Sequence, residues 1–190
     1  MTSRPDRIYL CVLPQDRAVA EAAGALWDDV SKCLYITPDM PQETFANWVV
    51  ECEATDEFAI ASPEAYVAAA NTACCRCRSQ IEIICIYCEY GADLDQPLTN
   101  FTVSNISSVD EALSEQLARW PNFRKDQSVF GHSFCFANHC PSCHAVQQEM
   151  RLHDEPDAPF FATPQGPPEA VRLTPLNGLV RLTGDCHFAI

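Results

Sequence analysis

Cysteines recur in this sequence as pairs with two residues between the members. The pairs are Cys74/Cys77, Cys85/Cys88 and Cys140/Cys143. A Cys-x-x-Cys turn directs two thiolates to one point, and a zinc ion takes four thiolate or imidazole ligands in a tetrahedron. Two such turns therefore predict one zinc ion. Because protein atoms fill all four positions, that ion would be structural rather than catalytic.

The surroundings of the pairs indicate which two share the ion. Cys85 and Cys88 lie in an alternating apolar run, and residues three apart on a strand point to opposite faces. The other two pairs stand beside turn-forming residues such as Pro141-Ser142. The expected ligands are Cys74, Cys77, Cys140 and Cys143. A pairing of Cys74/Cys77 with Cys85/Cys88 stays open, as do mixed sites with Cys75, His139, His144, Cys186 or His187.

Composition and charge narrow the class of protein. Among 190 residues, 47% are hydrophobic and 20% charged, which predicts a packed core. No apolar run approaches the roughly 18 residues that span a membrane. The first seven residues lack the apolar core of a signal peptide. These features predict a cytoplasmic protein, with no membrane partner.

The charge is strongly acidic. There are 26 acidic and 12 basic residues, a formal net charge of −14, and the lysines are Lys32 and Lys125. A surface that binds nucleic acid through its phosphates needs a basic patch, whereas an acidic surface attracts a basic protein. The sequence therefore favours a basic protein as partner. Clustering suggests as partner-binding candidates Asp28, Asp29, Glu51, Glu53, Asp154 and Glu155.

Periodicity predicts an α+β protein that begins with a small β-α-β-α domain over residues 1–52. Alternation predicts strands at 7–13 and 33–36. Helices are predicted from Asp16 to Leu26 and from Pro41 to Cys52, each with one apolar face.

A second domain, residues 63–190, is predicted to be zinc-ribbon-like with a helical insertion over 89–134. We expect a short helix at 62–71, a strand at 80–88, a loop at 91–107 and a helix from the Ser108–Glu111 capping box to Pro121. Strands are expected at 130–137 and 146–152, and a long loop at 153–168. Asn177-Gly178 predicts a C-terminal β-hairpin of 171–176 with 179–182.

Two resemblances follow from particular stretches. The N-terminal segment resembles a small domain of unknown function that occurs beside plasmid primases and topoisomerase zinc fingers. The matching stretches are Arg7–Leu10, Ala22–Asp28, Lys32–Ile36 and Phe45–Trp48. Members of that family carry basic residues before the Gly-Ala and the Trp, where this chain has Glu21-Ala22-Ala23 and Leu26.

The remainder resembles uncharacterised bacterial proteins that join the same domain to a split zinc ribbon. The matching stretches are Cys74–Cys77, Ala137–Cys143, Leu152–Pro156 and Pro159–Phe161. The resemblance implies that the two knuckles share one metal, and it implies no activity.

The residues favour binding over catalysis. No P-loop, dinucleotide glycine pattern or HExxH is present. Cys135 could pair with His132 or His139, but it lies in an apolar run without a cation to lower its pKa. His153-Asp154-Glu155 could form an acid–base or metal cluster and is interpreted as a solvated turn. We therefore expect a protein that is not an enzyme.

Two functions are consistent with this interpretation. The first is an acidic protein-interaction module, such as an immunity protein or inhibitor of a basic bacterial toxin. The alternative is an accessory nucleic-acid-binding protein of DNA processing, for which Arg76 and Arg78 supply the only basic cluster near the metal.

Overall fold

A computed structural model describes most of the chain. The described residues are 7–10, 12, 16–28, 33–46, 48, 58–94, 96–127, 134–163 and 166–188. They form a three-stranded, a five-stranded and a two-stranded sheet with a few short helices, which confirms the α+β class. None of the described helices has the length and apolar character needed to cross a membrane.

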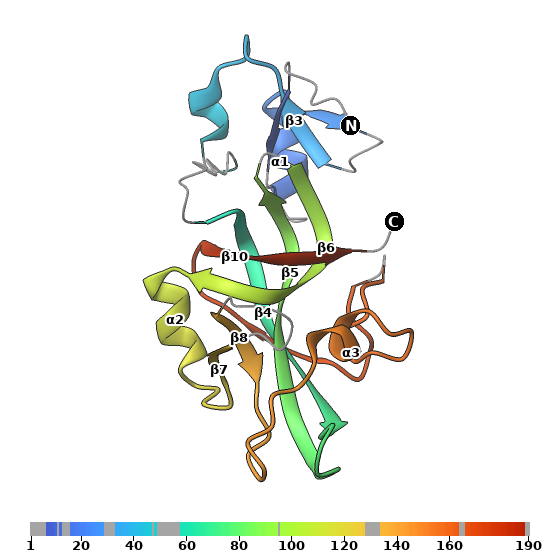
Figure 1. The fold of residues 1–190 in the computed structure, drawn as a ribbon. Coiled ribbons are helices and arrows are strands. Elements are labelled where there is room, and N and C mark those ends of the chain that lie inside the picture. The colour runs from blue at the N-terminus through green and yellow to red at the C-terminus, as the bar shows by residue number, and fades with distance from the viewer. Residues whose placement is uncertain are drawn as a thin grey trace.

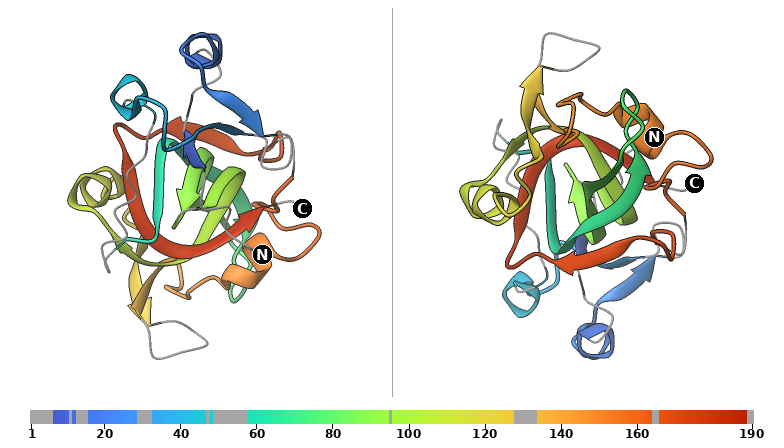
Figure 2. Two further views of the ribbon diagram at one scale, coloured as in Figure 1. Left: turned by 90° about the horizontal axis from the view of Figure 1, so that it is seen from above. Right: turned by 90° about the horizontal axis from the view of Figure 1, so that it is seen from below.

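The largest sheet closes into a small barrel. Four of its five strands form the ring, namely β4 (Ile60–Ala73), β5 (Gln80–Asp93), β6 (Gln96–Val109) and β10 (Val180–Phe188), and the fifth, β9 (Arg172–Pro175), pairs with β4. The order is β10-β6-β5-β4, and β10 also pairs with the start of β4, so the ring is complete (Figure 1). Figure 2 shows the ring from above and from below. Closure leaves these strands few unpaired edges.

Both faces of β5 are buried, which explains the continuous apolar run in its sequence. Ile84, Ile86 and Cys88 pack in one hydrophobic cluster, whereas Ile83 and Cys85 pack in another on the opposite face. Burial on both faces replaces the apolar–polar alternation of a half-exposed strand with a continuous apolar sequence.

The barrel closes tightly at Gly91. A Cβ atom at this position would lie 2.7 Å from the carbonyl oxygen of Ala61 and 3.0 Å from the Phe101 ring. Only glycine lets the backbones of β4 and β5 approach this closely.

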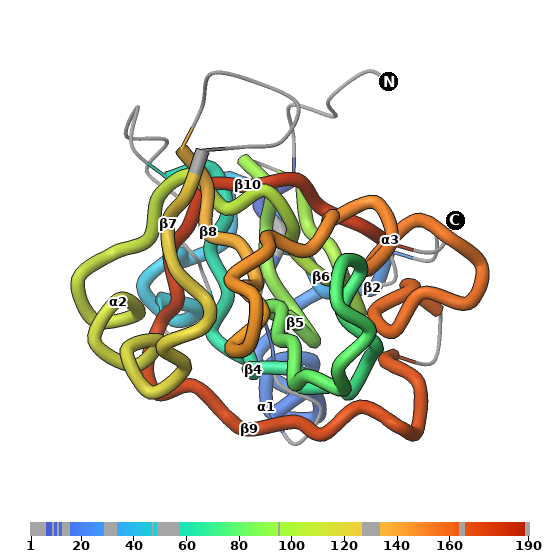
Figure 3. Tube along the Cα trace, turned by 60° about the horizontal axis from the view of Figure 1, so that its bottom comes forward, coloured from blue at the N-terminus to red at the C-terminus, as the bar shows by residue number. Residues whose placement is uncertain are grey.

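Helix α2 (Glu111–Leu117) covers the barrel from outside with a buried face of Leu113 and Leu117. Its N-cap is Asp110, whose carboxylate accepts from Leu113 N–H at 2.7 Å. The predicted helix is confirmed, and the capping residue lies two positions after the expected Ser108. The hairpin of β7 (Phe123–Gln127) and β8 (Phe134–Asn138) runs beside it (Figure 3).

The N-terminal residues form a separate small sheet in the order β1-β3-β2, with a core of its own around Phe45. The elements are β1 (Ile8–Leu10), α1 (Arg17–Ala22), β2 (Leu26–Asp28), β3 (Cys33–Ile36) and the 3₁₀ turn η2 (Gln42–Phe45). The β-α-β-α prediction is corrected here. Helix α1 ends before Gly24, whose φ of +108° turns the chain into an additional strand, β2. The last residues of the predicted second helix, 49–52, lie outside the described residues.

Two predictions in the second domain were wrong because local propensity was overridden. Residues 62–71 were expected as a helix and form β4. Their alanines favour a helix, but pairing with β5 along the whole strand decides their conformation. Residues 91–107 were expected as a loop and lie largely in β5 and β6, where polar side chains such as Thr102 and Ser104 are buried.

The C-terminal predictions also need correction. Residues 146–152 are not a strand: Val146 makes one bridge to His139, and helix α3 (Glu149–His153) follows. The predicted C-terminal hairpin does not form. β9 (Arg172–Pro175) pairs with Tyr66–Ala69 of β4, and β10 pairs with Ile60–Ser62 of the same strand. The two strands therefore follow one edge of β4 in succession instead of pairing together.

Candidate metal centre

The two cysteine knuckles lie side by side at one end of the molecule. The first forms the tip of the β4–β5 hairpin, and the second follows β8, at the bottom of Figure 1. Segments far apart in the sequence are thus brought to one point by the barrel and by the β7–β8 hairpin.

The first knuckle has a compact backbone. Cys74 N–H donates to Ser79 O at 2.8 Å, and Arg78 N–H donates to Cys74 O at 3.1 Å. Arg78 adopts a left-handed conformation with φ of +64°. The turn therefore exposes backbone N–H groups to the Cys74 sulfur, which accepts from Arg76 N–H at 3.4 Å.

The second knuckle repeats this geometry. Cys140 N–H donates to Ala145 O at 3.0 Å, and His144 N–H donates to Cys140 O at 2.9 Å. His144 has φ of +58°, as Arg78 has in the first knuckle. Two turns of the same hydrogen-bond pattern thus face one another, each presenting two sulfurs.

The four sulfur atoms form one compact group, in which all Sγ atoms lie within 4.8 Å of one another. The Cys74–Cys143 separation is 3.7 Å and the Cys77–Cys140 separation is 3.6 Å. These distances exceed the roughly 2.05 Å of a disulfide. They match the roughly 3.8 Å edge of a tetrahedron with metal–sulfur bonds of roughly 2.3 Å. The group could therefore hold a metal ion.

Hydrogen bonds favour the thiolate form in the first knuckle. The backbone N–H of Cys77 is the main cause that lowers the pKa of Cys74 to about 6. The side chain of Ser79 is the main cause that lowers the pKa of Cys77. Since the thiolate is the metal-binding form, these hydrogen bonds prepare the two sulfurs of the first knuckle for an ion.

Gln147 ties the two knuckles together from a buried position. Its side-chain oxygen accepts from Cys75 N–H at 2.9 Å, and its nitrogen donates to Ala145 O at 2.8 Å and lies 3.6 Å from the Cys74 sulfur. One amide therefore contacts the backbone of both turns and one of the sulfurs.

Asn138 anchors the second knuckle to the barrel. Its side chain exchanges two hydrogen bonds of 2.8 Å with the backbone N–H and C=O of Ile84. β5 pairs with β6 from Ile86 to Asp93, so Ile84 lies before the part of β5 that pairs with β6. The Asn138 amide thus takes the place of a neighbouring strand. Neither Asn138 nor Gln147 was predicted, and their only signal is a polar residue flanking a Cys-x-x-Cys turn.

The structure does not bring the other candidate ligands to the four sulfurs. His139 is buried, with Nδ1 at 2.9 Å from Ala137 O and Nε2 at 2.9 Å from Asp126. His144 is exposed and is not part of the sulfur group. Cys85 and Cys88 lie in opposite hydrophobic clusters, as the strand geometry predicted. Cys186 packs against the barrel core.

The acidic candidates have different surroundings. Asp28 is buried and forms an ion pair of 2.6 Å with Arg7, which removes it from an open acidic surface. Asp154 is exposed and contacts His187 at 3.0 Å, and Glu155 is exposed near Arg151. Asp29, Glu51 and Glu53 lie outside the described residues.

A family of small domains and a much longer protein are each similar to part of this chain. Over 59 residues the chain is 36% identical to the "DNA primase TraC" of Escherichia coli, an alignment that covers 31% of this chain and 6% of that protein. No solved structure matches the chain. Residues 7–49 match the family described as "Domain of unknown function (DUF5710)", in agreement with the resemblance of this segment to a domain found beside plasmid primases.

Proposed function

We propose that Cys74, Cys77, Cys140 and Cys143 bind one structural zinc ion, and that the protein acts by binding a basic partner. The convergence of four sulfurs from two matching knuckles carries the zinc assignment. A tetrahedral set of four thiolates selects zinc or iron over harder ions. Because every position would be filled by sulfur, no site is left on the ion for water or substrate.

The ion would add to the contacts by which Gln147 and Asn138 join two parts of the fold. One knuckle ends the β4–β5 hairpin, and the other begins the segment that leads through α3 to the last strands. Structural zinc in small sites contributes roughly 10 kcal/mol or more to folding. Removal of the ion would therefore weaken the attachment of the segment after β8 to the end of the barrel.

Metal analysis of protein purified without added zinc tests this proposal. We expect one equivalent of zinc and no visible iron–thiolate absorption. Cys140→Ser/Cys143→Ser should lose the metal. Cys75→Ser is the matched control, because Cys75 lies in the first knuckle and its sulfur contacts Val146 O at 3.6 Å instead of joining the four. Metal below one equivalent in the wild-type protein, or equal loss in both variants, would contradict the assignment.

The basic partner is supported by charge. The chain carries a net charge of −14, and the loop after α3 exposes Asp154, Glu155 and Asp157. Opposite charges across an interface raise the association rate and make it depend on salt. An inhibitor of a basic bacterial toxin would use these properties, and a rigid, metal-clamped scaffold would present the surface in one conformation.

Capture at low salt from the native cells, followed by binding measurements with the purified partner, tests the interaction. We expect one basic protein whose association rate falls steeply with ionic strength. Glu155→Gln/Asp157→Asn should lower that rate, whereas Gln116→Ala on helix α2 serves as a control. A partner that is itself acidic, or binding that salt leaves unchanged, would refute the charge argument.

The similarity to a DNA primase over 59 residues favours a second candidate function, nucleic-acid binding. Arg76 and Arg78 are exposed on the first knuckle. If they contact phosphates, Arg76→Ala/Arg78→Ala should abolish binding of a fluorescent single-stranded oligonucleotide, and Arg119→Ala, an exposed arginine on another surface, should not. Binding that survives the double substitution would refute this role for the knuckle.

A further inference from the structure

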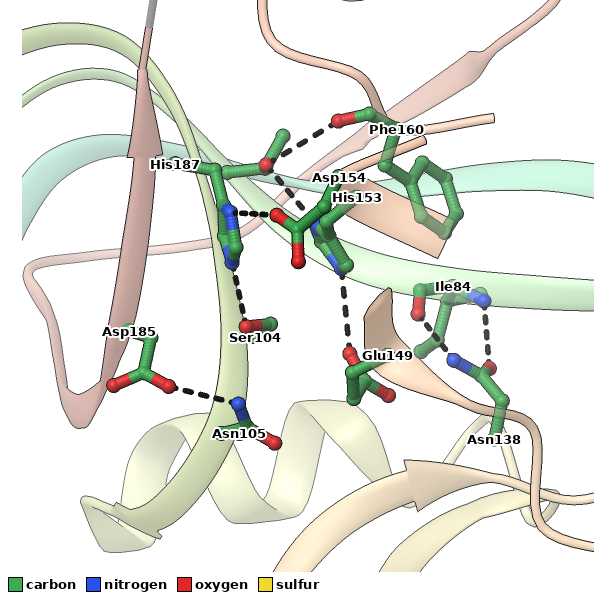
Figure 4. Close-up of polar contacts among 11 residues, drawn as sticks. Ile84, Ser104, Asn105, Asn138, Glu149, His153, Asp154, Phe160, Asp185 and His187 are labelled. Atoms are coloured by element: carbon green, nitrogen blue, oxygen red, sulfur yellow. Dashed lines mark hydrogen bonds and ion pairs between the residues drawn. The ribbon is translucent and has the colours of Figure 1, made fainter. Parts of the chain in front are cut away.

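Ser104, His187 and Asp154 form a hydrogen-bonded chain on the side of the barrel (Figure 4). Ser104 Oγ lies 2.6 Å from Nε2 of His187, and Asp154 Oδ1 lies 3.0 Å from Nδ1 of the same ring. The two ring nitrogens thus contact a hydroxyl and a carboxylate. This is the arrangement by which an imidazole removes a proton from a serine.

The pairing of β6 with β10 creates this geometry. Ser104 is opposite Asp185, and the next pair is Ser108 with Thr183, so β6 has three residues where β10 has Gly184 alone. Such bulges redirect side chains and occur beside active sites. A Cβ at Gly184 would lie 2.6 Å from Ser104 O, so glycine is required for this approach. Asn105, the first bulged residue, has φ of +48°.

The hydroxyl and the imidazole border a cavity of about 310 Å³. Its other walls include Phe136 from β8, Met150 from α3, and the segment that follows the second knuckle. His187 is 21% exposed at its side chain. Ser104 is 2% exposed, so a small molecule in the cavity would lie against the His187 ring and reach the Ser104 hydroxyl beside it.

We propose that this cavity is a hydrolytic site in which Ser104 is the nucleophile, His187 the general base and Asp154 a positioning residue. The substrate class is a small ester that is uncharged or cationic. Among the described residues lining the cavity there is no lysine or arginine, whereas Asp126, Glu149, Asp154 and Asp185 contribute carboxylates. An anionic ester would be repelled.

The chemistry is acyl transfer to serine and then to water. Ser104 Oγ bonds to the ester carbonyl carbon while its proton moves to His187 Nε2. The carbon–oxygen bond to the alcohol breaks, and the alcohol leaves with the proton from His187. Water then attacks the acyl-serine, giving its proton to His187, which returns it to Ser104 as the acid leaves. The amide of Gln148 in the cavity wall would donate to the carbonyl oxygen, whereas the amide of Asn105, which also lines the cavity, already donates to Asp185 at 2.7 Å.

The neighbours of His187 suit a base. Burial is the main cause that lowers the pKa of His187, with His153 adding to it, while Asp154 and Asp185 act in the opposite direction. The neutral imidazole that accepts a proton is therefore present at neutral pH. His153 stacks on His187 with ring centroids 4.7 Å apart and is itself held by Thr102 at 3.1 Å and Glu149 at 3.3 Å.

This inference goes beyond the proposed binding function, departs from the expectation that the chain is not an enzyme, and involves no metal ion in the chemical steps. It is tested on the full chain with an uncharged alkyl fluorophosphonate and with 4-nitrophenyl butyrate. The phosphonate should form a bond to Ser104 Oγ with loss of fluoride, and peptide mass spectrometry should find the added mass on Ser104. Ser104→Ala should abolish labelling, and His187→Gln should slow it about 100-fold or more.

Matched variants separate catalysis from structural effects. Ser107→Ala removes a hydroxyl of the same strand that donates to Thr183 O, and it should label at the wild-type rate. Asp154→Asn should slow labelling and move the acidic limb of the pH–rate profile to lower pH, because the carboxylate that favours the imidazolium is removed. Glu115→Gln, which alters an exposed carboxylate on helix α2, should change neither.

Three results would overturn the proposal. The first is folded wild-type protein that neither labels nor hydrolyses the ester. The second is label or acyl group on Cys135, a thiol in the cavity wall, instead of Ser104. The third is equal reactivity in Ser104→Ala and wild-type protein.

Discussion

The side chain of Asn138 should be among the most important polar groups for stability, and Asn138→Ala measures its contribution. The substitution leaves the N–H and the C=O of Ile84 without their partners at a buried edge of β5. Each buried backbone group that loses its partner costs about 1–3 kcal/mol. The expected loss in the free energy of unfolding is therefore about 2–6 kcal/mol.

Urea denaturation followed by circular dichroism, in a buffer of fixed free zinc, measures this loss. For a urea dependence of roughly 2 kcal/mol per molar, the midpoint should fall by roughly 1 M or more. Asn71→Ala is the matched control, because Asn71 is exposed on β4 and such substitutions change stability by roughly 0.5 kcal/mol or less. Equal midpoints for the two variants would refute the anchoring role.

Asn138→Asp gives an independent check on the direction of the hydrogen bonds. The carboxylate still accepts from Ile84 N–H, but it places a second acceptor against Ile84 O. Only the protonated carboxyl can donate there, so the folded state should raise the pKa of the new group. The variant should therefore regain stability as pH falls and lose it as pH rises through the pKa in the folded protein.

Three further substitutions probe other parts of the fold. Gln147→Ala removes the amide that contacts both knuckles, so it should weaken zinc binding about 10–100-fold. A competition titration with a chromophoric chelator measures this affinity, and an unchanged value would contradict the prediction. Gly91→Ala should lower the free energy of unfolding by about 1–3 kcal/mol, because its Cβ would lie 2.7 Å from Ala61 O. An unchanged melting temperature would show that β4 and β5 can move apart at this position without loss of stability. Burial is the main cause that raises the pKa of Glu64, and Glu89 adds to it, so the wild-type protein should lose stability as pH rises through that pKa. Glu64→Gln should therefore be more stable than the wild-type protein at pH 7 but not at pH 3. A variant less stable than the wild-type protein at pH 7 would contradict this reasoning.

The convergence of the four cysteines could be predicted from sequence because the geometry of each pair is local. A Cys-x-x-Cys turn fixes the geometry of two sulfurs within a few residues, and flanking turn formers distinguish Cys140/Cys143 from the strand pair Cys85/Cys88. The sequence could not reveal Asn138 as an anchor, because its partner is the backbone of Ile84 and no residue type at that position identifies it.

The barrel was missed for a related reason. β4 is buried on both faces and rich in alanine, so neither alternation nor propensity marks residues 65–70 as a strand. β6 has the opposite composition, with buried Thr102 and Ser104 in place of apolar residues. Pairing with distant strands decides that both segments are strands. A local window of sequence does not contain this long-range register.

The same register explains why Ser104 and His187 were not connected beforehand. They are 83 positions apart, and a bulge that depends on Gly184 aligns them. Asp154 reaches His187 from the loop after α3, on the segment that starts at the second knuckle. One wall of the cavity therefore belongs to the barrel, and the other is positioned by the knuckle and by Gln147. An ion on the four sulfurs would fix that second wall against the first, so a distant structural metal could keep Asp154 within hydrogen-bonding distance of the imidazole.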